Sequence, residues 1–163
     1  MVLDRVARLL LAVMCLGGAT ACGDGGPTSP TPPAETMIAP ASIIGRTVTV
    51  TIREAHTRCT APPGTVVHYH FENADTVRGV RADGIFDYPT KAWSYARTGA
   101  HSAQIEITWE NDGRNEVGLA FSADDRGTFE QRDFATPGEV YCGDVTTLHY
   151  RGDFEVQLGA VPS

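Results

Sequence analysis

The sequence predicts an all-β fold: a single antiparallel barrel of seven or eight strands over residues 42–159, with a β-sandwich as the alternative. Apolar and polar residues alternate along nearly every segment of this region, as in strands with one face on a core. Turn sequences separate the segments, and no adequate window outside the N-terminus has the 3.6-residue apolar period of a helix. A sequential meander favours the barrel, because closure removes exposed edges.

The first 21 residues are expected to be a signal peptide. Arg5 and Arg8 precede a short apolar run, residues 9–16, whereas a membrane-spanning helix needs about 20 apolar residues. Ala19 and Ala21 then stand before Cys22, and this pattern resembles the lipobox of bacterial lipoproteins. The resemblance implies lipid attachment at Cys22, with the protein held in the bacterial cell envelope on the extracytoplasmic side of a membrane. The alternative is an ordinary signal peptidase site of the A-x-A type.

Residues 22–41 are expected to be a lipidated cysteine followed by a tether, because Gly, Pro, Ser and Thr dominate this stretch. The N-terminal lipid would make the membrane a partner without a transmembrane helix. The whole chain has 13 basic and 20 acidic residues. Removal of the signal with Asp4, Arg5 and Arg8 leaves 11 and 19. No basic cluster remains, which argues against nucleic acid as a partner.

The strands of the domain are expected in order along the chain, each with its apolar residues at every second position facing the core. Asp112-Gly113 predicts a tight hairpin, and residues 97–100 and 124–127 predict two further reversals. The expected core-facing sets are Val48, Val50 and Ile52; Val67, Tyr69 and Phe71; Trp93 and Tyr95; Ala103, Ile105, Ile107 and Trp109; Val117, Leu119 and Phe121; and Leu148, Tyr150, Phe154, Val156 and Leu158.

A series of aromatic, glycine and aliphatic positions from about residue 65 to 158 is similar to small calycin-like barrels, including MoaF-like domains. The resemblance implies an architecture, and it brings no shared catalytic residues. The positions that carry it are Trp93, Tyr95, Gly99, Ala103, Ile105, Leu119, Phe121, Gly127, Phe129, Gly152 and Phe154.

Two cysteines remain in the domain, Cys59 and Cys142, near its opposite ends. In an oxidising exported compartment they predict a disulfide. The alternatives are two unpaired thiols or a metal-binding pair.

His68 and His70 are the candidate metal ligands, because residues two apart on a strand project to one face. Zinc accepts two histidines and one carboxylate, which Glu72 could supply. However, Val67, Tyr69 and Phe71 take the core side of the same strand. The sequence therefore favours surface histidines, and it predicts no metal and no cofactor.

The aromatic residues on the apolar faces suggest a cavity for a small hydrophobic ligand, with a solid core as the alternative. The leading hypothesis is an exported lipoprotein that binds such a ligand or an envelope protein. The first alternative is an inhibitor of an envelope hydrolase, with contact loops at residues 57–64 and 134–143. An enzyme that uses the barrel cavity is the third hypothesis, and no residue is assigned a catalytic role. The candidate ligand-binding residues are Tyr69, Trp93, Tyr95, Trp109, Phe121 and Tyr150.

Overall fold

The structure, a computed structural model, describes residues 36, 38–56, 59, 61–81, 84–85 and 89–159, and of residues 84–85 only the backbone. These residues belong to one compact unit, Ala34–Ser163. The expected signal peptide and Cys22 lie outside the described residues. No helix in the described ranges is long and apolar enough to cross a membrane.

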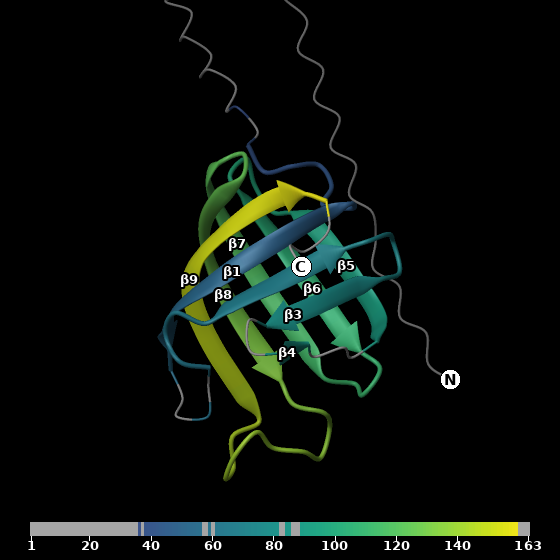
Figure 1. Cartoon of the computed structure of the whole chain (residues 1–163), viewed down its shortest axis with the longest axis vertical. Helices are drawn as coiled ribbons and strands as arrows, with labels where there is room; N and C mark the ends of the chain where they lie inside the picture. Colours follow the sequence, from purple (N-terminus) through teal and green to yellow (C-terminus); the bar gives the residue numbers. More distant parts are fainter. Residues whose placement is uncertain are drawn as a thin grey trace, which may run out of the picture. The chain divides into compact units, whose positions relative to one another are not determined.

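The domain is all-β, as predicted, and forms a nearly closed antiparallel barrel (Figure 1). One sheet contains every strand of the described residues, in the order β4-β3-β2-β1-β9-β8-β7-β6-β5. Eight strands have five or more residues, and β4 has two. The strands are β1 Arg46–Ala55, β2 Val66–Phe71, β3 Val77–Arg81, β4 Gly84–Ile85, β5 Thr90–Arg97, β6 Ser102–Trp109, β7 Arg114–Ala123, β8 Arg126–Phe134 and β9 Thr147–Leu158.

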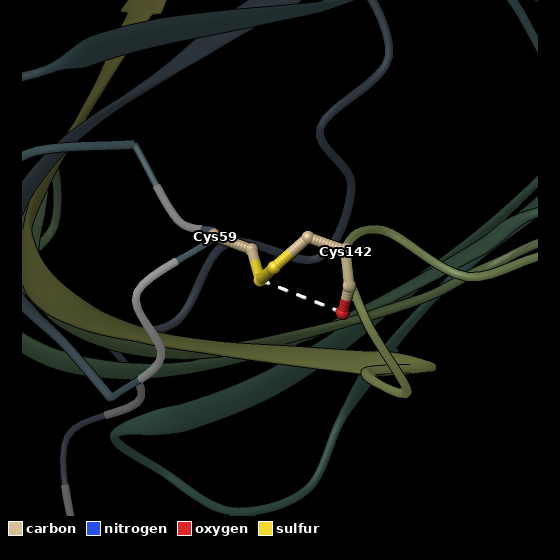
Figure 2. The surroundings of a disulfide bond; sticks show 2 residues. All are labelled: Cys59 and Cys142. Carbon is tan, nitrogen blue, oxygen red and sulfur yellow. Dashed lines mark hydrogen bonds between the residues drawn. A yellow bond between two sulfur atoms is a disulfide. The ribbon is translucent and has the colours of Figure 1, made fainter.

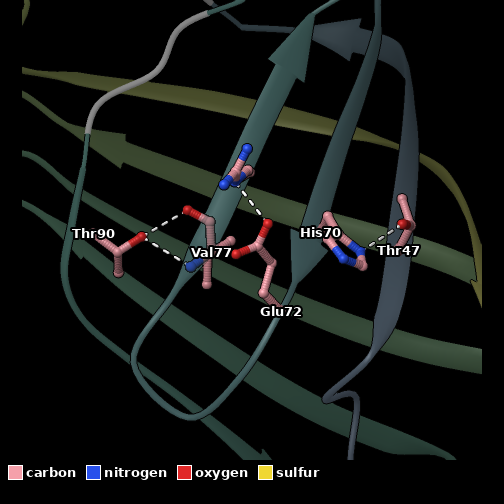
Figure 3. A network of polar contacts seen from close by, with 6 residues as sticks. Thr47, His70, Glu72, Val77 and Thr90 are labelled. Atoms are coloured by element: carbon pink, nitrogen blue, oxygen red, sulfur yellow. Dashed lines mark hydrogen bonds and ion pairs between the residues drawn. The ribbon is translucent and has the colours of Figure 1, made fainter. Parts of the chain in front are cut away.

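Side chains close the seam between β3 and β5. The hydroxyl of Thr90 donates a hydrogen bond of 2.7 Å to the carbonyl of Val77 and accepts one of 3.1 Å from its amide (Figure 3). Next to this contact, the rings of Phe71 on β2 and Trp93 on β5 pack with their centroids 4.9 Å apart. The sheet therefore curls until its first and last long strands meet.

The alternation predicted from the sequence sets the core. Val48, Val50 and Ile52 of β1 are buried, and so are the other predicted sets, except for Trp93 and Tyr95, which are half-buried, and Leu158. Leu158 is a correction: it is 82% exposed, because it ends β9 where the core has already stopped. The prediction extended the period one step too far.

The folded domain begins earlier than the expected boundary at residue 42. Ala39 and Ile43 are buried in the core. The amides of Ile38 and Ala39 donate hydrogen bonds to the carbonyl of Ala100, at 3.0 and 3.1 Å. Residues 38–40, which the composition assigned to the tether, therefore pack against the barrel.

Gly127 on β8 and Gly152 on β9 each let a neighbouring strand come close, β7 in the first case and β1 in the second. Gly127 lies opposite Phe154, and Phe129 lies opposite Gly152, so that each glycine is paired with a phenylalanine. A Cβ atom on Gly127 would lie 1.9 Å from the carbonyl oxygen of Ala120, and one on Gly152 would lie 2.0 Å from that of Thr51. Only glycine fits at these two positions.

Candidate functional site

A pocket of about 480 Å³ opens inside one end of the barrel. Inward-facing side chains near the ends of β1, β2, β6, β7, β8 and β9 form its wall, and the β8–β9 connection, residues 135–146, contributes to its mouth. Figure 1 shows this connection extending beyond the strand ends. The lining includes Val50, Ile52, Ala61, Val67, Tyr69, Arg81, Trp109, Arg114, Asn115, Gln131, Asp133, Glu139, Val140, Tyr141 and Tyr150.

A chain of polar side chains crosses the floor of the pocket. The indole Nε1 of Trp109 donates to Oδ1 of Asn115 at 2.5 Å. The amide nitrogens of Asn115 and Gln131 each donate to Oδ1 of Asp133 at 2.7 Å. These contacts link β6, β7 and β8 through side chains that point into the barrel, where most inward residues are apolar.

Asp133 is the ionisable group at the centre of this network. Protein atoms surround its carboxyl, although solvent still reaches the residue in part. Burial raises the pKa of Asp133 to about 7, and the hydrogen bonds from Gln131 and Asn115 act in the opposite direction. Near neutral pH the group can therefore exist as an acid or as a carboxylate.

Three tyrosines surround the acid. Burial is the main cause that raises the pKa of the Tyr69 and Tyr150 hydroxyls well above the usual range, and the charge of Asp133 adds to it. The same two causes raise the pKa of Tyr141 to about 12. The hydroxyl of Tyr69 also accepts a 3.0 Å hydrogen bond from Gln131. These phenols therefore remain neutral donors at physiological pH.

The mouth of the pocket carries the disulfide. Cys59 and Cys142 are bonded, with their Cα atoms 6.0 Å apart, as the cysteine pattern predicted (Figure 2). The bond ties the β1–β2 connection to the β8–β9 connection, which places Val140 and Tyr141 beside the opening. These two side chains are 50% and 41% exposed. The disulfide thus fixes an apolar rim.

Three of the six candidate ligand-binding residues line the pocket: Tyr69, Trp109 and Tyr150. The other three do not line it. Phe121, near the C-terminal end of β7, packs edge-to-face on Phe154 with centroids 4.9 Å apart.

Trp93 and Tyr95 on β5 are half-buried against other parts of the barrel. The indole nitrogen of Trp93 donates to the carbonyl of Asn73 at 3.1 Å, and the hydroxyl of Tyr95 donates to that of Pro40 at 2.6 Å. Both side chains hold the closing side of the barrel together.

The two histidines are on the face opposite the core, as the alternation predicted. Nδ1 of His70 lies 3.1 Å from the hydroxyl of Thr47 (Figure 3), and Nδ1 of His68 lies 2.9 Å from that of Thr49. Glu72 forms an ion pair of 2.7 Å with Arg78. Among the described residues no group of three His, Cys, Asp or Glu side chains could hold a metal ion.

Sequence reasoning missed Asn115, Gln131 and Asp133. A signal for them exists, because the period of two continues from Val117 back to Asn115 and from Phe129 forward to Gln131 and Asp133. Polar residues at core-facing positions of a strand indicate either a buried network or a site.

Comparison with known proteins yields little for this chain. No protein-family model matches the sequence, and no curated protein matches it. A solved structure titled "Structure of EF1p2_mFAP2b bound to DFHBI" is similar with a TM-score of 0.44 and 13% identity, over 69% of this chain and 92% of that chain. This similarity is too low to bear on function.

Proposed function

We propose that the protein is a ligand-binding barrel of the bacterial cell envelope, anchored by a lipid on Cys22, and that its ligand occupies the pocket above Asp133. The observation that supports binding is the pocket itself. Its volume of about 480 Å³ is in the usual range for small-molecule sites. Its lining combines apolar and aromatic side chains with polar and charged ones, of which Asn115 and Gln131 converge on Asp133.

The ligand is expected to be amphipathic, which refines the apolar ligand expected from the sequence. Val50, Val67 and Trp109 offer an apolar wall. Asp133 and Gln131 offer hydrogen-bonding groups at the floor. A purely apolar ligand would cover Oδ2 of Asp133, to which neither amide donates, without offering it a hydrogen bond, which costs binding free energy.

A blocking substitution tests binding. The protein for this test is the unlipidated mature chain, residues 22–163 with Cys22→Ser, and the probe is the neutral fluorophore N-phenyl-1-naphthylamine. Ala61→Phe places a ring in the pocket and should abolish the fluorescence increase. Ala120→Phe, on the exposed face of β7, is the matched control and should preserve it. Equal binding by both variants would contradict the proposal, and so would failure of the parent chain to bind both this probe and the three smaller ligands tested below.

The anchor is tested in bacterial cells that express the full chain. An alkyne analogue of palmitate should label the protein, Cys22→Ser should abolish the label, and globomycin should cause the precursor to accumulate. The lipoprotein assignment would be wrong if the protein stayed unlabelled and appeared in the soluble fraction, and if globomycin did not change its processing.

A second function, contact with an envelope protein, is supported by the rim. Val140 and Tyr141 are exposed apolar side chains held next to the disulfide. Such residues favour a protein contact, including that of a hydrolase inhibitor. In-cell photocrosslinking from position 140 should give a discrete adduct, whereas crosslinking from Ala96 on the exposed side of β5 should not. Identical patterns from both positions would count against this function.

A further inference from the structure

Within the part of the chain that the structure describes, no cationic side chain forms an ion pair with Asp133. Both of its hydrogen-bond donors, from Asn115 and Gln131, are neutral amides, and both contact Oδ1. The ion pairs among the described residues lie at or near the surface of the domain, and none of them includes Asp133. Buried carboxylates are normally paired with a cation or a metal ion.

We propose that the pocket takes a small organic cation: a primary ammonium on an apolar, ring-bearing body, with the ammonium against Asp133. This inference rests on the proposed ligand-binding function, and it names the ligand class. The ammonium supplies the positive partner that none of the described side chains provides to Asp133. Its N–H groups reach Oδ2, the carboxylate oxygen to which neither amide donates.

Aromatic side chains around the acid favour a cation over a neutral ligand. Trp109, Tyr69 and Tyr150 line the pocket from three strands, and Tyr141 lines it from the rim. Aromatic rings attract ammonium groups through their quadrupole, by about 0.5–2 kcal/mol for each favourable contact. The same rings provide the apolar surface for the body of the ligand.

The remaining charges of the pocket agree with this assignment. Arg114 also lines the pocket, but it is already paired with Glu116, at 3.0 Å, and its guanidinium carbon lies 4.5 Å from the centroid of the Phe134 ring. Glu139 adds a second carboxyl to the lining. Arg81 also lines the pocket, and its charge lowers the pKa of Tyr150. An anionic ligand would have to lie beside two acids.

Three ligands of similar shape and different charge test the proposal: phenethylamine, 2-phenylethanol and 3-phenylpropionate. The unlipidated mature chain has two tryptophans, and Trp93→Phe leaves Trp109 in the pocket as the only reporter of fluorescence. At pH 8 the amine should bind at least about tenfold more tightly than the alcohol, the size of one well-placed charged contact. The carboxylate should bind most weakly.

Asp133→Asn keeps the size of the side chain and removes its charge. This variant should lose at least about tenfold in affinity for the amine and stay within about threefold of the parent for the alcohol. Asp124→Asn, in the exposed β7–β8 turn, is the control and should change neither affinity. If Asp133→Asn does not fold, the affinities of the parent chain for the three ligands still test the cation assignment.

The outcomes separate this inference from the proposed function. Equal binding of amine and alcohol, or preference for the carboxylate, overturns the cation assignment and leaves a ligand pocket. Binding of N-phenyl-1-naphthylamine without binding of any of the three ligands has the same consequence. Failure of all four compounds to bind would overturn the proposed function together with the inference.

Discussion

Asn115 and Asp133 are direct cross-strand partners on β7 and β8, and both side chains point into the barrel. The amide of Asn115 donates a hydrogen bond of 2.7 Å to the carboxyl of Asp133. A neutral partner at this distance holds the carboxyl in place without neutralising it. The pair therefore leaves a fixed acid at the floor of a pocket, and the predictions below follow from that arrangement.

The free energy of unfolding of the parent chain is expected to fall as pH rises, and that of Asp133→Asn is expected to fall less. The folded-state pKa of Asp133 is about 7, above its ordinary value of 3.8. Between these two pH values the unfolded chain releases the proton while the folded chain retains it, so the free energy of unfolding falls as pH rises. The fall is on the order of 4 kcal/mol and is complete above pH about 7.

Guanidinium denaturation at pH 5 and pH 8 measures this difference. The parent chain should lose more stability between the two pH values than Asp133→Asn, and Asp124→Asn should behave as the parent does. An equal change for the parent and Asp133→Asn would mean that Asp133 titrates in the folded protein as it does in the unfolded chain.

Asn115→Ala is expected to raise the pKa of Asp133 further. The Asn115 amide lowers this pKa because it donates to the charged form, so its loss favours the neutral acid by up to about one pKa unit. A ¹³C carboxyl NMR titration of the variant measures the shift. Gln104→Ala, on the outer face of β6, is the control. An unchanged or lower pKa in Asn115→Ala would show that the amide does not act on the acid.

Loss of the disulfide is expected to destabilise the domain and loosen the rim. The bond closes a sequence separation of 83 residues. The chain-entropy model assigns such a crosslink about 4–5 kcal/mol. Cys59→Ser with Cys142→Ser should lower the midpoint of denaturation, and dithiothreitol should lower that of the parent chain alone. Faster amide exchange should be concentrated in the two connections that the bond joins, β1–β2 and β8–β9. A variant as stable as the parent would refute this role of the bond.

Gly127→Ala and Gly152→Ala are each expected to destabilise the barrel by more than about 2 kcal/mol, since overpacking against backbone cannot relax through side-chain movement. The added methyl groups would lie 1.9 and 2.0 Å from backbone oxygens. Gly118→Ala is the matched control on β7, where the nearest atom would be 3.9 Å away. Thermal unfolding of the three variants measures the difference, and equal melting temperatures would contradict the close approach.

Much of the fold could be predicted from alternation alone. The period of two placed Val48, Tyr69 and Phe121 in the core, and it placed His68 and His70 on the opposite face. Alternation reports which face a residue occupies, and it does not report where a core ends. This is why Leu158 was placed in the core. Residues 38–40 were assigned to the tether from composition, which does not report whether a segment packs on the domain.

The aromatic residues of the site could be predicted from the sequence, and its polar residues could not. Tyr69, Trp109 and Tyr150 were found because aromatic residues on an apolar face are visible in the sequence. Asp133 was not found, because its hydrogen-bonded environment depends on strand register. The register of β7 and β8 places Asn115, 18 positions earlier in the chain, opposite Asp133. Polar residues at inward positions are the signal that the sequence does contain.

The most direct test of this account is the pKa of Asp133 itself, measured by ¹³C carboxyl NMR in the unlipidated mature chain with and without phenethylamine. We expect a value near 7 in the free protein, and a fall of at least about one unit when the amine is bound, because a cation stabilises the carboxylate. A free-protein value near 4, unchanged by the amine, would contradict both the buried acid and the ligand assigned to it.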